Sequence, residues 1–253
     1  MALTSSTKFV NRVPWVRQAM SEACKLSKTV DITPLHSIPT WTRELSEYEY
    51  YLLAVGSTIS EFLSSLEYLQ HTSYYLNEFR PTKRQREAGI THYCHIQYHT
   101  EAFIIRAASL YDRVLILVDA IFHLGIDSRY ITHDIIVSNA HIKSSKILPT
   151  LKALKKIVDK YRDPRNTVIH RQSYTDNELR LIAFYSILNQ ETDEEKTYEL
   201  QCTYMTKRYV ADKQKEIAEF YAKLEDKLFT LFTELAPYYT YNCTLLQKLD
   251  SST

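Results

Sequence analysis

The stretch SKILPTLKALKKIVDKYRDPRNTVIHRQ, residues 145–172, indicates two helices in direct succession. The first, expected over 145–161, has an apolar face at helical spacing, made by Ile147, Leu151, Leu154, Val158 and Tyr161. Asp163 is a favourable N-cap residue and Pro164 suits the first helical position, so a second helix is expected to begin there. Its first two turns carry an arginine, an asparagine and a histidine.

Apolar residues at helical spacing also occur on both sides of this stretch in the sequence. We predict long helices at about 46–79, 91–124 and 203–236, the second of them ended by Gly125. A short helix is expected near Pro14–Lys25, and a helical turn near HDIIVS. Thr175 and Glu178 have capping-box spacing ahead of LRLIAFYSIL, which favours another helix, although so apolar a run also suits a buried strand.

These elements predict an all-α protein, an up-down bundle of four to five long helices with an N-terminal extension. We divide the chain into an arm over residues 1–45 with a short helix, a helical bundle over 46–240 and a tail over 241–253. Three glycines in 253 residues are too few for a Gly-rich phosphate loop or for many tight hairpins.

Charge is balanced overall but not locally. The net charge of +1 excludes a nonspecific polyanion binder as a description of the whole chain. Residues 143–171, in contrast, hold six lysines and three arginines against two aspartates, a local net charge of +7. Such a segment could guide an RNA backbone, or could be a solvated helix face offset by the acidic stretch 191–199.

The four cysteines form no CxxC pair, so neither a zinc knuckle nor a disulfide framework is indicated. No apolar run reaches the length that spans a bilayer, and the first residues lack the design of a signal peptide. We therefore expect a cytoplasmic protein with no membrane partner. We also expect no cofactor and no metal.

The residues most able to carry chemistry are Arg165, Asn166 and His170, which form the pattern R-N-x-x-x-H. On a helix Asn166 and His170 share a face, whereas Arg165 and His170 differ by about 140° at a hundred degrees per residue. One copy of the motif therefore does not bring the arginine and the histidine together.

This motif, at the start of a helix that follows a long one, resembles the HEPN superfamily (higher eukaryotes and prokaryotes nucleotide-binding domains). The segment YHTEAFIIRAASLYDRVLILVDAIF is similar to the second helix of stand-alone bacterial members. The resemblance covers about residues 45–236. It implies an all-helical, metal-independent ribonuclease that works as a homodimer, in which two motif helices meet and form a composite site.

Carried over position by position, the resemblance makes His170 the general acid and base of RNA cleavage. Arg165 would bind the scissile phosphate, and Asn166 would orient His170 or hold a phosphate oxygen. The products would be a 2′,3′-cyclic phosphate and a 5′-hydroxyl. The resemblance suggests a toxin or anti-phage defence effector, with an antitoxin or regulatory partner.

Further RNA contacts are expected from the basic segment, at Lys156, Lys160, Arg162 and Arg171. Asp112 could support the site by pairing with Arg165, or could make an ordinary ion pair elsewhere.

Several plainer alternatives stay open. Arg165 and Asn166 would be solvated first-turn residues and His170 an ordinary half-buried histidine if the site were inactive. Many HEPN relatives are non-catalytic modules that bind nucleotide, RNA or protein.

Three further features of the sequence give weaker indications of function. His95 and His99, with His92 and Glu101 nearby, could ligate a divalent metal. The segment RPTKRQRE could contact RNA, or be a solvated loop. The twenty tyrosines could stack on bases, although most are expected at the edges of helix packing.

Overall fold

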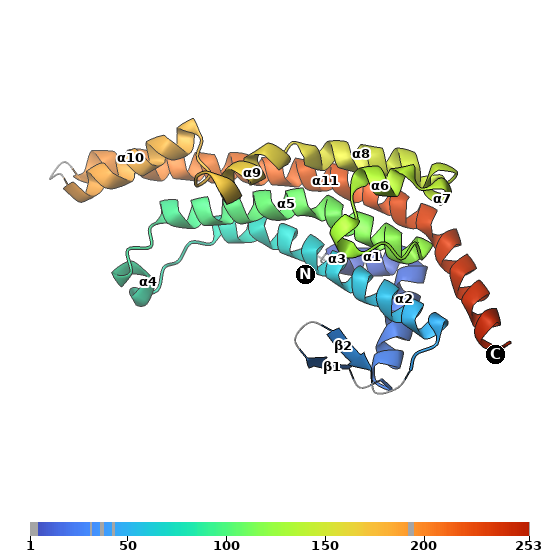
Figure 1. Cartoon of the computed structure of the whole chain (residues 1–253). Helices are drawn as coiled ribbons and strands as arrows, with labels where there is room; N and C mark the ends of the chain where they lie inside the picture. The colour runs from blue at the N-terminus through green and yellow to red at the C-terminus, as the bar shows by residue number, and fades with distance from the viewer. Residues whose placement is uncertain (1–4, 31, 36–37, 42–43, 192–194, 253) are drawn as a thin grey trace. The chain divides into compact units, whose positions relative to one another are not determined.

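The computed structural model describes residues 5–30, 32–35, 38–41, 44–191 and 195–252. Helices account for almost all of the regular structure in these ranges, which confirms the predicted all-α class (Figure 1). The described residues also include one antiparallel hairpin, in which β1 (Ile32–Leu35) pairs with β2 (Ile38–Trp41) and Ile32 lies opposite Trp41. None of the helices in the described part of the chain is both long and apolar enough to cross a membrane.

The helices are, in chain order, α1 (Ser5–Arg12), α2 (Pro14–Ser27), α3 (Glu47–Asn77), α4 (Lys83–Glu87), α5 (His92–Phe122), η1 (Ser128–Tyr130), α6 (His133–Ser138), α7 (Ala140–Lys143), α8 (Ile147–Asp159), α9 (Arg162–His170), α10 (Asn177–Glu191) and α11 (Glu195–Asp250). The chain divides into two compact units, and α3, α5, α8 and α11 each contribute residues to both.

Unit 1 contains residues 1–67, 109–155 and 225–253. Its core joins the N-terminal helices to the last part of α11. The indole N–H of Trp15 in α2 donates a hydrogen bond to the Phe232 carbonyl oxygen at 2.9 Å, and the Phe9 and Phe229 rings stack with centroids 4.2 Å apart. Much of the predicted N-terminal arm is therefore packed against α11.

Unit 2 contains residues 68–108 and 156–224 and includes the motif helix α9. Three aromatic rings pack edge-to-face at its centre, with centroids 5.0 to 5.7 Å apart. They are Phe103 of α5, Phe220 of α11 and Tyr161, which lies between α8 and α9. Such edge-to-face pairs are favoured by the ring quadrupole. Because Tyr161 directly precedes α9, this core fixes where the motif helix begins.

Most predicted helices are present close to their expected bounds. The run LRLIAFYSIL lies in α10, so the helix is confirmed and the strand is excluded. The last helix is longer than predicted at both ends and continues through Pro237. The predicted stop was misplaced: α5 ends at Phe122, and the left-handed residue directly after it is His123, with a φ of 53°. Gly125, with a φ of 68°, lies two residues farther on.

The predicted start of the motif helix was wrong. Asp163 is not the N-cap: α9 begins at Arg162 after Tyr161, and the Arg165 N–H donates to the Tyr161 carbonyl oxygen at 2.9 Å. Tyr161 is held by tertiary packing, and its side chain makes no capping hydrogen bond to α9. Pro164 is tolerated because the N–H groups of a first helical turn have no partner within the helix.

Candidate functional site

The motif helix α9 presents one polar face to an open pocket of about 490 Å³. The pocket is lined by Asp163, Asn166, Thr167, His170 and Arg171, and the first four have the spacing of a single helix face. No residue of α9 is buried, and His170 is exposed. The asparagine and the histidine of the motif are therefore together and open to a ligand.

Arg165 is not among the residues that line this pocket. Its side chain is half-buried, and its Nη1 donates a hydrogen bond to Asn166 Oδ1 at 3.3 Å. Its Nε is buried with no hydrogen-bond partner among the described residues. A buried guanidinium N–H without an acceptor costs free energy.

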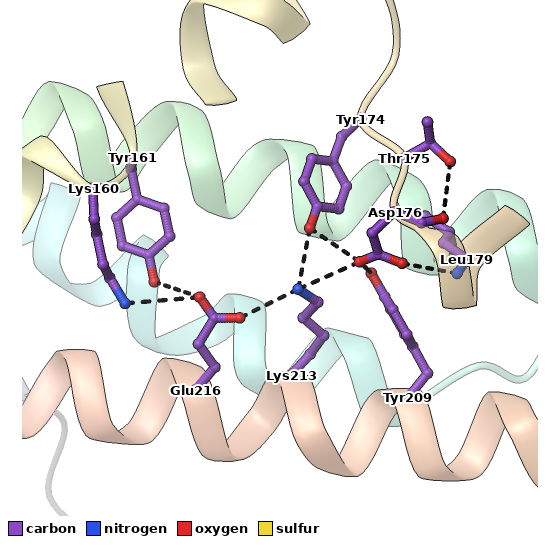
Figure 2. A network of polar contacts seen from close by, with 9 residues as sticks. All are labelled: Lys160, Tyr161, Tyr174, Thr175, Asp176, Leu179, Tyr209, Lys213 and Glu216. Atoms are coloured by element: carbon purple, nitrogen blue, oxygen red, sulfur yellow. Dashed lines mark hydrogen bonds and ion pairs between the residues drawn. The ribbon is translucent and has the colours of Figure 1, made fainter. Parts of the chain in front are cut away.

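A polar network fixes the chain on both sides of α9 (Figure 2). On the N-terminal side, the Tyr161 hydroxyl donates to Glu216 Oε1 of α11 at 3.1 Å. On the C-terminal side, Lys213 Nζ donates to the Tyr174 hydroxyl at 3.1 Å and lies 3.6 Å from Asp176 Oδ2. Lys213 also donates to Glu216 Oε2 at 3.2 Å. Two residues one helical turn apart in α11 thus hold both flanks of the motif helix.

The segment between α9 and α10 is also held by α5 and by a cap on α10. The Tyr174 backbone N–H donates to Glu101 Oε1 at 2.7 Å, and Gln97 Nε2 donates to the Tyr174 carbonyl oxygen at 3.1 Å. Asp176 caps α10 by accepting from the Leu179 N–H at 2.8 Å, so the cap is Asp176 and not the expected Thr175. The motif helix therefore lies between two immobilised ends.

The charges of this network reinforce one another. Burial alone would raise the pKa values of Asp176 and Glu216, but hydrogen bonds and the Lys213 ammonium outweigh it and lower both. Burial alone would lower the pKa of Lys213, yet Tyr174 and Glu216 outweigh it and raise that pKa. The lysine and both carboxylates are therefore ionised at neutral pH.

A family model described as HEPN_Cthe2314-like HEPN matches residues 57–235, well over half of the chain, and spans the motif helix. The chain belongs to the HEPN superfamily. Membership makes it a HEPN-type nucleotide-binding or ribonuclease module. No curated protein and no solved structure matches the chain.

The expected RNA contacts of the HEPN motif segment differ in their surroundings. Lys156 and Arg162 are exposed, and Arg171 lines the motif pocket. The Lys160 ammonium lies 3.7 Å from Glu216 Oε1 and 4.5 Å from the centroid of the Tyr161 ring. Lys160 thus shares its charge with the network that holds the HEPN helix.

Asp112 falls within unit 1, whereas Arg165 belongs to unit 2. The pairing between them stays a prediction.

The arrangement of side chains at the start of α5 gives little support to a metal site at His95 and His99. His95 Nε2 lies 2.6 Å from the Tyr75 carbonyl oxygen, which makes it a hydrogen-bonding partner of that oxygen. In the described ranges no group of three or more His, Cys, Asp or Glu side chains is placed to hold a metal ion.

Sequence reasoning missed the residues that hold the HEPN helix from outside it: Tyr174, Asp176, Tyr209, Lys213 and Glu216. Tyr209 joins this network because its hydroxyl donates to Asp176 Oδ2 at 3.0 Å. Lys213 and Glu216 have the i, i+3 spacing of an ordinary helical ion pair. Only the fold brings the two flanks of α9 onto that pair, so no local signal distinguished it.

Proposed function

We propose that this HEPN protein is a metal-independent endoribonuclease that acts as a homodimer in the cytoplasm. The observation that carries the proposal is the division of the motif: Asn166 and His170 share an open pocket, whereas Arg165 lies off that pocket with an unpartnered Nε. A second copy would bring its Arg165 to the His170 of the first, and the two chains together would complete each site.

The chemistry follows from the groups that the two copies would supply. The neutral imidazole of His170 accepts the proton of a ribose 2′-hydroxyl, whose oxygen attacks the adjacent phosphorus. Arg165 of the other copy stabilises the charge on the non-bridging oxygens as the P–O5′ bond breaks. The 5′-oxygen takes a proton from the imidazolium, leaving a 2′,3′-cyclic phosphate and a 5′-hydroxyl. No metal ion enters this scheme.

Exposed apolar residues on α9 and α10 support a self-association surface in unit 2. Ile169 is 43% exposed, and Leu181, Phe184 and Ile187 of α10 are 47 to 55% exposed. Large apolar side chains that meet solvent are suited to a protein contact, and Ile169 is next to His170 in the motif itself.

Cleavage in EDTA is the first test. The purified protein is expected to cut single-stranded or transfer RNA with the chelator present, and His170→Ala and Arg165→Ala are each expected to abolish cutting. His141→Ala, which removes an exposed histidine of unit 1, is the matched control. Unchanged cutting by both motif variants would refute the assignment.

The composite site has a sharper test. A mixture of the inactive His170→Ala and Arg165→Ala proteins forms mixed dimers in which one of the two sites pairs an intact arginine with an intact histidine. With random subunit exchange, activity should return to roughly a quarter of the wild-type value, since half the dimers are mixed and carry one good site. A mixture that stays inactive after exchange would mean that Arg165 and His170 act within one chain.

A toxin or defence role, with an antitoxin or regulator that restrains it, is the biological setting we propose. Expression should then be toxic for the wild-type protein and tolerated for His170→Ala. A protein that binds RNA but cuts none at any pH would instead be a non-catalytic HEPN module.

A further inference from the structure

Outside the motif, unit 2 carries a run of aromatic and imidazole rings where α3 ends and α5 begins. We call Tyr68, His71, Tyr75, His99 and Tyr98 the aromatic strip. Neighbouring rings in this order have centroids 5.3 to 6.5 Å apart, and Tyr75 stacks on His99 at 24°. At one end, the Arg106 guanidinium lies over the Tyr68 ring, 5.8 Å from its centroid.

The tyrosines of the strip are not edges of helix packing. Tyr68, Tyr75 and Tyr98 are 58, 53 and 68% exposed, so a large part of each ring meets solvent. Tyrosines that serve the core bury the ring and expose at most the hydroxyl, as buried Tyr161 does in this unit. Rings that are held by their neighbours and still exposed are suited to stacking against a flat ligand.

The other end of the strip leads to a basic loop. His95 lies 4.4 Å from His99 and 5.0 Å from Phe79 between ring centroids, and Phe79 stacks on His92 at 4.8 Å. Phe79 follows α3 and His92 begins α5, so this ring pair closes the base of the loop that contains α4 (Figure 1).

Charge on this loop favours an anionic ligand. Residues 78–87 contain Arg80, Lys83, Arg84 and Arg86 against two glutamates, a net charge of +2. The loop helix is fixed by a capping box between Thr82 and Gln85. Arg84 is exposed on this helix, whereas Lys83 lies 3.8 Å from Glu87 Oε1 and Arg86 donates to the Pro81 carbonyl oxygen at 2.7 Å.

Two imidazoles of this ring cluster, His92 and His99, act as rings and not as charges. Burial, with a smaller effect of His95, lowers the pKa of His92 and lowers that of His99 to about 4. Both are therefore neutral at physiological pH. Neutral rings next to cations that lie on a separate loop are the combination found where proteins hold bases and phosphates of a single strand.

We propose that the aromatic strip and the α4 loop bind unpaired nucleotides of single-stranded RNA, with bases stacked on Tyr75 and Tyr98 and phosphates held by the loop cations. This proposal deepens the ribonuclease function above and rests on it. The strip would set the substrate class, because paired bases cannot present their faces to a tyrosine. Helix α5 carries Tyr98 and His99 of the strip and also holds the motif segment through Gln97 and Glu101.

The test measures binding directly, in the full chain carrying His170→Ala so that the probe survives. The probes are a fluorescent single-stranded oligouridylate and a duplex RNA of the same length. Tyr75→Leu and Tyr98→Leu remove a ring and keep apolar bulk, and each should weaken binding of the single strand about fivefold or more. Tyr98→Phe keeps the ring and should bind like the parent.

Two controls isolate stacking from fold and charge. Tyr241→Leu removes a tyrosine of α11 that is 65% exposed in unit 1, close to the 68% of Tyr98, and should leave binding unchanged. Arg84→Ala should flatten the dependence of affinity on salt, because fewer counterions are released. Circular dichroism verifies that every variant keeps its helix content.

Equal binding of single strand and duplex would overturn the proposal, and so would parental affinity in both leucine variants. Either result can occur while wild-type protein still cuts RNA in EDTA, which would leave the ribonuclease function standing. Conversely, the wild-type protein could cut no RNA while binding of the single strand still depended on the strip. That result would support the binding proposal and refute the ribonuclease function.

Discussion

Lys213→Met tests whether the network beneath the motif helix stabilises unit 2. The variant keeps a long apolar stem and removes the ammonium, which lies 3.1 Å from the Tyr174 hydroxyl, 3.2 Å from Glu216 Oε2 and 3.6 Å from Asp176 Oδ2. Two carboxylates would then lose their common counter-ion.

The magnitude follows from the exposure of the partners. Breaking a fully buried pair by removing one charge costs about 3–5 kcal/mol. Here the Asp176 and Glu216 side chains are 33 and 41% exposed, so water compensates in part. We therefore expect the free energy of unfolding at pH 7 to fall by about 2–3 kcal/mol.

Urea unfolding followed by far-ultraviolet circular dichroism measures this loss. Lys215→Met is the matched control, because Lys215 is exposed on the same helix and should change stability by less than about 0.5 kcal/mol. Adding Glu216→Gln to Lys213→Met should cost less than the sum of the two single changes, since each removes the same interaction.

The contribution of Asp176 and Glu216 to stability depends on pH. The folded-state pKa values of Asp176 and Glu216 are lowered, so their contribution is present above the unfolded values near pH 4 and is lost as pH falls through the folded ones. The stability gap between wild type and Lys213→Met should hold at neutral pH and shrink below about pH 4. A gap unchanged down to pH 3, or a variant as stable as Lys215→Met, would refute the reasoning.

Three further outcomes are expected. By NMR, the ring protons of His99 should titrate with a midpoint near pH 4, and a midpoint at the usual value near 6.5 would contradict its burial. Gly56→Ala should lower the melting temperature because its methyl group would collide with Ala23, and adding Ala23→Gly should restore much of the loss; no rescue would mean that the two helices do not touch. Asp176→Ala should lower the free energy of unfolding by about 1–2 kcal/mol more than Asp176→Asn, because asparagine keeps an acceptor that can cap α10. Chemical denaturation measures both variants, and equal losses would mean that Asp176 does not cap α10.

Periodicity was a reliable guide to the long helices and a poor guide to their ends. The apolar stripes predicted the bodies of α3, α5, α8 and α11, because each helix buries one face whatever its partner is. Local capping rules placed the start of α9 at Asp163, whereas packing of Tyr161 against Phe103 and Phe220 placed it earlier. Tertiary contacts replaced the local signal there.

The structure places several weaker features of the sequence next to one another. The histidines of α5, the basic RPTKRQRE segment and the twenty tyrosines were interpreted separately, each with a functional and an ordinary alternative. Phe79 and His92 stack across the base of the α4 loop and bring these features onto one surface. Sequence spacing could not predict this, since Phe79 and His92 belong to different elements.

The sequence by itself determined the helical class, the HEPN motif and the geometric separation of Arg165 from His170, because all three follow from residue order and the helical repeat. The tertiary structure decided what holds that motif. Lys213 and Glu216 lie more than forty residues beyond Arg165 in the chain, yet they bind the segments on both sides of α9. Contacts between residues so far apart depend on how helices pack, which no local pattern encodes.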